Sequence, residues 1–161
     1  MDFRILMALF LSTYVNKVDK KGRVSVPSQF RAALTGQEFH GVILFRSSKF
    51  DALEGFTWDF MRDLADRVDS FDLFSDAQDD LATAIFSDSV QLPFDNEGRI
   101  ILPQSLMDHA GINDQAAFVG LGKKFQLWSP ERLAARQAAA RKNVQEKGLT
   151  IPQQGGGGHD K

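Results

Sequence analysis

The sequence contains no cysteine among its 161 residues. Disulfide bonds and thiolate metal ligands are therefore excluded. Histidine is also scarce, because His40, His109 and His159 are the only three and they lack the spacing of a metal site. We expect neither a metal nor a cofactor.

Sequence motifs of common enzyme classes are absent as well. The chain has no glycine loop ending in Lys-Ser or Lys-Thr for phosphate, and no nucleophile elbow. The adjacent acids Asp79 and Asp80 fit an exposed helix face better than an acid–base pair. We therefore expect no catalytic residues, no enzymatic activity and no small-molecule substrate.

The sequence also has no long hydrophobic run. The apolar stretch Ile5–Leu11 is far shorter than the roughly 20 residues that span a bilayer. No small-residue cleavage site follows it, as a signal peptide would require. The stretch predicts a buried strand, and we expect no membrane association.

Net charge is only −2, but the charges are segregated. Residues 1–50 carry eight Lys and Arg against three Asp and Glu, whereas residues 51–80 carry two against ten. Overall charge therefore does not identify a partner, and any nucleic-acid surface must be local and near the N-terminus.

One segment occurs twice. Asp19–Pro27 (DKKGRVSVP) and Asp95–Pro103 (DNEGRIILP) lie 76 positions apart and share Asp, Gly, Arg and Pro in register. Lys49-Phe50 and Lys124-Phe125 extend the likeness at an offset of 75. An internal repeat of this kind predicts two copies of one unit packed as a pseudo-symmetric pair.

Each copy predicts the order strand, strand, helix, strand, strand. Gly22 and Gly98 suit a turn with positive φ, and a proline before each helix suits its start. We expect the second strand pair of the first copy at Gly41–Phe45 and Phe50–Leu53. The fold class is α+β, with boundaries at 12–57 (first repeat), 58–88 (acidic helical connection), 89–132 (second repeat), 133–147 (C-terminal helix) and 148–161 (disordered glycine-rich tail).

The repeated element Asp-x-x-Gly-Arg-x-x-x-Pro closely resembles the SpoVT/AbrB-type swapped-hairpin DNA-binding domain. Two copies in one chain, with VDKKGRVSVPSQFR at residues 18–31, resemble the MraZ family. The resemblance covers about residues 11–145. It implies two pseudo-symmetric, double-psi-like β-barrel half-domains with added helices, and a bacterial transcriptional regulator of the division and cell-wall gene cluster.

The resemblance implies that the turn arginine contacts DNA, which here means Arg23 and Arg99. Lys20, Lys21 and Arg31 accompany Arg23 in sequence, and their charges suit phosphates or guanine edges. In the second copy Asn96-Glu97 replace the lysines and Met107 replaces Arg31. Arg99 therefore either contacts DNA, pairs with Asp95 or packs between the repeats.

Four further residues are expected to shape the turns rather than touch DNA. Asp side chains bind the backbone of such turns, and glycine allows their positive φ. These turn-structural residues are Asp19, Gly22, Asp95 and Gly98.

We expect a sequence-specific DNA-binding repressor in the cytoplasm, associated with the nucleoid. One basic turn gives few phosphate contacts, which favours several linked subunits. The resemblance implies a ring-shaped homo-oligomer that binds tandem operator repeats upstream of a gene in double-stranded DNA. The alternative is an antitoxin-like protein-interaction module without specific operator binding. Its expected apolar anchors are missing from the glycine-rich tail.

Overall fold

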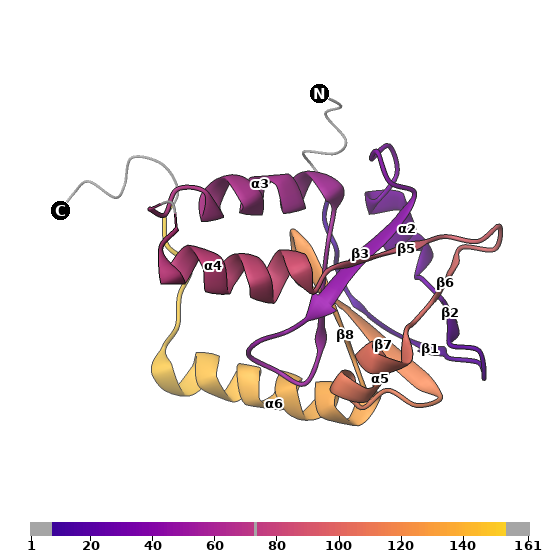
Figure 1. The fold of residues 1–161 in the computed structure, drawn as a ribbon. Coiled ribbons are helices and arrows are strands. Elements are labelled where there is room, and N and C mark those ends of the chain that lie inside the picture. Colours follow the sequence, from indigo (N-terminus) through magenta and orange to yellow (C-terminus); the bar gives the residue numbers. More distant parts are fainter. Residues whose placement is uncertain (1–7, 73, 154–161) are drawn as a thin grey trace. The chain divides into compact units, whose positions relative to one another are not determined.

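The computed structural model describes residues 8–72 and 74–153. The first repeat has the predicted order of elements and is followed by one more helix (Figure 1). Its elements are β1 (Thr13–Lys17), β2 (Arg23–Ser25), α2 (Ser28–Ala33), β3 (Gly41–Arg46), β4 (Leu53–Phe56) and α3 (Trp58–Val68).

The second repeat runs through the same order. A short helical connection precedes it, formed by α4 (Asp76–Ala82) and the π-helical turn η1 (Thr83–Ser87). The repeat itself consists of β5 (Val90–Pro93), β6 (Arg99–Ile101), α5 (Gln104–Ala110), β7 (Gln115–Gly120), β8 (Lys124–Trp128) and α6 (Pro130–Lys147).

The strands exchange partners between the repeats. One six-stranded antiparallel sheet has the order β1-β7-β8-β4-β3-β5, and β2 pairs with β6 in a separate two-stranded ribbon. The first strand of each repeat therefore pairs with the third strand of the other repeat. When each strand is exchanged for its counterpart in the other repeat, the result is the same strand order read from the opposite edge of the sheet. The sheet is therefore pseudo-two-fold symmetric.

The α+β class is confirmed, but a closed barrel is not found. Strands β1 and β5 are the two edges of the sheet, and no pairing joins them in the described residues. Strands β2 and β6 pair with each other in the separate ribbon, and Val24 of β2 forms an isolated bridge to Val18, the residue after β1.

Phenylalanines from both repeats form the main core. Phe10 and Phe30 of the first repeat contact Phe125 of the second, with ring centroids 4.9 and 5.3 Å apart. All three side chains are fully buried. Ile43, Phe45, Phe56 and Met61 form a second cluster between the sheet and α3, and α3 and α4 lie side by side in Figure 1.

The last strand of the first repeat begins later than expected. The sequence predicts a strand over Phe50–Leu53, whereas β4 spans Leu53–Phe56. Ser47 holds the intervening loop, since its Oγ accepts hydrogen bonds from the backbone N–H groups of Lys49 and Phe50 at 3.1 Å. The register pairs Glu54 with Gln126 at the centre of β4 and β8, so Leu53 and not Phe50 corresponds to Phe125.

Two predicted terminal segments lie partly outside the described residues. Of the stretch Ile5–Leu11, the structure describes the last four residues, where Phe10 forms a single bridge to Gly122 and not a strand. The glycine run at 155–158 lies outside the described residues. The described residues from Glu131 onward, with most of α6, form a separate compact unit.

Candidate nucleic-acid interface

The turn between β1 and β2 is closed by the Asp19 side chain. Its Oδ1 accepts hydrogen bonds from the backbone N–H groups of Lys21 and Arg23, both at 2.9 Å. The backbone adds a bond from the Gly22 N–H to the Asp19 carbonyl at 3.0 Å. Gly22 has φ +85°, the left-handed region that glycine adopts at no steric cost.

The turn between β5 and β6 has the same construction. Asp95 Oδ1 accepts from the backbone N–H groups of Glu97 (2.8 Å) and Arg99 (2.9 Å). Gly98 has φ +75°. The two turns thus share one geometry although their central residues differ in charge.

Each turn aspartate also holds the arginine four residues later. Arg23 Nε donates to Asp19 Oδ2 at 2.6 Å, and Arg99 Nε donates to Asp95 Oδ2 at 2.8 Å. Because these bonds use Nε, the terminal Nη1 and Nη2 groups can still donate to a ligand. The side chains of Arg23 and Arg99 are 36% and 28% exposed.

These hydrogen bonds lower the pKa of both aspartates. The largest cause is the backbone N–H of Arg23 for Asp19 and of Arg99 for Asp95, and the arginine side chains add to it. The hydrogen bond that Arg99 donates to Asp95 raises the pKa of Arg99, and the charges of Asp95, Glu97 and Asp19 contribute. Both aspartates are thus ionised at neutral pH.

The β2–β6 ribbon brings both arginines to one face. The register pairs Arg23 with Ile101 and Ser25 with Arg99. Residues paired across antiparallel strands point to the same side of the sheet. The other side carries Val24 and Ile100, each 1% exposed, so the outer face displays Arg23, Ser25, Arg99 and Ile101.

A shallow groove of about 390 Å³ runs beside the ribbon. It concentrates positive charge, with four cationic side chains against one carboxylate. Its lining consists of Lys17, Val18, Asp19, Lys20, Arg23, Ser25 and Arg99.

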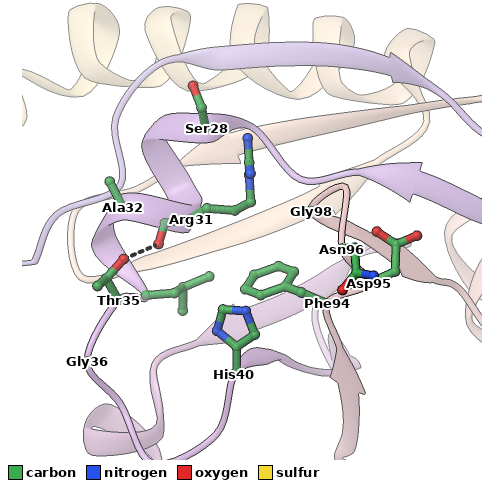
Figure 2. A pocket seen from close by; sticks show the side chains of 11 residues that line it. Ser28, Arg31, Ala32, Thr35, Gly36, His40, Phe94, Asp95, Asn96 and Gly98 are labelled. Atoms are coloured by element: carbon green, nitrogen blue, oxygen red, sulfur yellow. Dashed lines mark hydrogen bonds between the residues drawn. The ribbon is translucent and has the colours of Figure 1, made fainter.

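Arg31 is separated from Arg23. Its Nε donates to the Val26 carbonyl at 3.2 Å. A Cβ on Gly98 would lie 2.4 Å from Arg31 Nη1, so the guanidinium packs against the turn of the second repeat. Figure 2 shows the pocket between α2 and this turn, with Arg31, His40 and Phe94 among its lining residues.

The corresponding pocket on the first turn carries Met107 in place of Arg31. It is lined by Lys20, Lys21 and Gly22 as well, and both lysines are exposed. Each turn therefore has a cation beside it: the first from its own lysines, the second from Arg31 of the other repeat.

Three interface residues were missed by the sequence reasoning. Lys17 lies in the basic groove, and Ser25 and Ile101 lie on the outer face of the ribbon. For Ser25 and Ile101 a signal was available in the sequence. Side chains alternate between the two faces of a strand, so the neighbours of the buried Val24 and Ile100 point outward.

Residues 8–72 and 74–153 contain neither a metal-binding cluster nor a membrane-spanning helix. No group of three or more His, Cys, Asp or Glu side chains gathers there in a way that could hold a metal ion. In the same residues, no helix combines the length and apolar character needed to cross a membrane.

Comparison with known proteins gives a consistent result. A family described as "MraZ protein, putative antitoxin-like" matches residues 85–148. The protein named "Transcriptional regulator MraZ" of Rickettsia felis is 46% identical over 145 residues, covering 90% of this chain and 97% of that protein. Proteins of the same name from Rickettsia rickettsii and Rickettsia bellii are 47% and 44% identical, with the same coverage of both chains.

Proposed function

Because this chain belongs to the MraZ family, we propose that it is a transcriptional regulator that binds specific sequences in double-stranded DNA. The observation that carries the proposal is the outer face of the β2–β6 ribbon. It holds Arg23 and Arg99 in matching turns, with Lys17 and Lys20 in the adjoining groove.

The ribbon suits the major groove, which admits a two-stranded β-ribbon. In this arrangement Arg23 and Arg99 donate Nη groups to base edges, with guanine N7 and O6 as the preferred acceptors. Lys17, Lys20 and Lys21 act as point charges on phosphates. Asp19 and Asp95 hold the two guanidinium groups before DNA arrives, which lowers the entropy lost on binding.

The two turns contribute unequally in this proposal. Glu97 Oε1 lies 3.7 Å from Arg99 Nη2 and repels phosphate, whereas the first turn has lysines at both central positions. Arg31 offsets part of this difference, because it adds a positive charge beside Gly98. We therefore assign Arg23 the larger role, and Arg99 and Arg31 a supporting role.

The family resemblance supports the rest of the architecture. We propose that residues 12–57 and 89–132 are swapped-hairpin half-domains of one DNA-binding unit. The acidic connection at 58–88 and the helix at 133–147 are added to this unit, and residues 148–161 form a tail. No catalytic step and no cofactor enter the mechanism.

We further propose a homo-oligomer, as a ring, that binds tandem operator repeats upstream of a gene and represses it. One ribbon per subunit makes few contacts, and several linked ribbons raise the effective concentration at neighbouring repeats. The protein then acts in the cytoplasm at the nucleoid. A mass equal to one chain in light scattering at micromolar concentration would contradict the oligomer.

Fluorescence anisotropy tests the proposed function directly. Labelled duplex from upstream of the gene is compared with a scrambled duplex at two salt concentrations. We expect tight binding to the upstream duplex alone, weakened by salt as phosphate contacts require. Equal binding to both duplexes would contradict sequence specificity, and binding to neither would favour the antitoxin-like interaction module.

A further inference from the structure

Ile101 is an exposed apolar side chain on the outer face of the ribbon, within the proposed interface. It is 59% exposed, although its neighbour Ile100 on the same strand is 1% exposed. The register places it directly opposite Arg23. Its Cγ2 lies 3.7 Å from the position that a Cβ on Gly22 would take, so it also borders the first turn.

The pseudo-symmetric counterpart of Ile101 is Ser25, which pairs with Arg99. The outer face thus carries two arginines at equivalent positions, one beside an isoleucine and the other beside a serine. The core does not require isoleucine at position 101, because Val24 and Ile100 already form the buried side of the ribbon.

An apolar group beside an arginine in the major groove has one distinctive partner. Guanine, cytosine and adenine present hydrogen-bonding groups there, whereas thymine adds a C5-methyl group. We propose that Ile101 contacts the C5-methyl group of a thymine next to the base that Arg23 reads. This inference rests on the proposed function, since it requires the ribbon to enter the major groove.

The contact would give the DNA site a direction. Ile101 at one end of the ribbon selects a thymine, and Ser25 at the equivalent position lacks an apolar group for the same purpose. A single chain therefore reads a non-palindromic site despite the two-fold symmetry of its backbone. Tandem sites bound by successive copies would then share one orientation.

Deoxyuridine tests this contact, because it differs from thymidine only by the missing methyl group. Each thymidine of the bound duplex is replaced in turn, and affinity is measured by anisotropy for the wild type, Ile101→Ser and the control Leu11→Ser. Leu11 is an apolar side chain of the same exposure, 59%, outside the ribbon. We expect one replacement to weaken wild-type binding by about fourfold, the factor that one buried methyl group supplies. The same replacement should leave the affinity of Ile101→Ser unaffected, while Leu11→Ser should respond as the wild type does.

Three results would overturn the inference. The first is equal wild-type affinity for every deoxyuridine duplex, and the second is an unchanged response of Ile101→Ser. The third is a change of oligomeric mass in Ile101→Ser without loss of methyl sensitivity, which would make Ile101 a contact between copies. Failure of the wild type to bind the unmodified duplex would instead refute the proposed function. The thermal midpoint of each variant is measured alongside its affinity, and a midpoint close to that of the wild type indicates that the substitution leaves the fold intact.

Discussion

Asp19 and Asp95 orient the arginines on which the proposed interface depends. Each carboxylate accepts two backbone N–H groups with one oxygen and the arginine Nε with the other. The aspartates therefore shape the turn and position the guanidinium at once. Their contribution requires the ionised form, because a protonated carboxyl loses acceptor capacity and charge.

This requirement predicts that the stability of the fold depends on pH in the acidic range. The folded pKa of Asp19 and Asp95 lies below the ordinary value of 3.8. The stabilisation is therefore complete above that value and is lost as pH falls through the folded pKa. We expect Asp19→Asn to lower the thermal midpoint at about pH 6 and to have a smaller effect at about pH 3.

Thermal denaturation of the wild type and Asp19→Asn across this pH range measures the difference between their thermal midpoints. Asp88, whose pKa is lowered by its hydrogen bonds with Arg46, remains in both proteins and leaves part of the acid transition unchanged. A gap between the two midpoints that does not change with pH would contradict the assigned role of Asp19.

Glu97 offers a gain-of-affinity prediction. It is exposed beside Arg99, and an acid there repels the DNA backbone. Glu97→Gln should tighten DNA binding by about fivefold at low salt, the scale of one charge pair at 4 Å in water. Glu38→Gln is the matched control, because the Glu38 side chain is also well exposed (63%, against 73% for Glu97) and pairs with an arginine, Arg62, away from the ribbon. Unchanged affinity in Glu97→Gln would place this turn outside the DNA contact.

Backbone hydrogen bonds between each turn and the other repeat hold the β2–β6 ribbon in place. The Leu102 N–H donates to the Gly22 carbonyl at 2.8 Å, and the Val26 N–H donates to the Gly98 carbonyl at 3.1 Å. The glycines thus serve two purposes, positive φ within their own turn and close approach to the opposite strand.

The two glycines should differ in their tolerance of alanine. Alanine costs about 1–2 kcal/mol at either site because of the left-handed backbone. A Cβ on Gly22 would also lie 2.8 Å from the Leu102 carbonyl oxygen, whereas on Gly98 it would meet the movable Arg31 side chain. Gly22→Ala should therefore lower the free energy of unfolding more than Gly98→Ala in urea denaturation. The reverse order would contradict the packing of the turns described here.

The order of elements was predictable because its signals are local. The Asp-x-x-Gly-Arg turn, the proline before each helix and the short β-branched strands occur in both copies. Gly111, with φ +67°, is the left-handed cap residue that ends α5, a position that favours glycine, whereas α2 ends at the cap residue Leu34, two residues before Gly36.

Contacts between the repeats were not predictable in the same way. Arg31 follows Arg23 by eight residues, and sequence proximity suggested one shared basic cluster. Strand exchange instead brings α2 against the turn at Gly98. The three-residue displacement of β4 has a local cause, because the loop that Ser47 organises separates β3 from β4 by six residues (47–52), whereas three residues (121–123) separate β7 from β8.

The exchange of strands makes the two repeats mutually dependent. Strands β1, β2, β4 and β5 each pair with a strand of the other repeat. The aromatic core is shared as well, because Phe30 packs between Phe10 of its own repeat and Phe125 of the other.

Neither half should therefore fold as a monomer. We expect residues 1–88 and residues 89–161, prepared separately, to lack a cooperative thermal transition as monomers. Mixing them should restore strand pairing and produce one, as measured by circular dichroism and size-exclusion chromatography. A half that melts cooperatively as a monomer would contradict the exchanged topology.

The most direct test of the account is the effect of Arg23→Ala on binding to the upstream duplex. Arg67→Ala is the matched control, because Arg67 also pairs with an aspartate four residues earlier but lies on α3. We predict that Arg23→Ala abolishes specific binding, measured by anisotropy, with a thermal midpoint close to that of the wild type, while Arg67→Ala binds normally. Wild-type affinity in a folded Arg23→Ala protein would contradict the central claim that the ribbon face reads DNA.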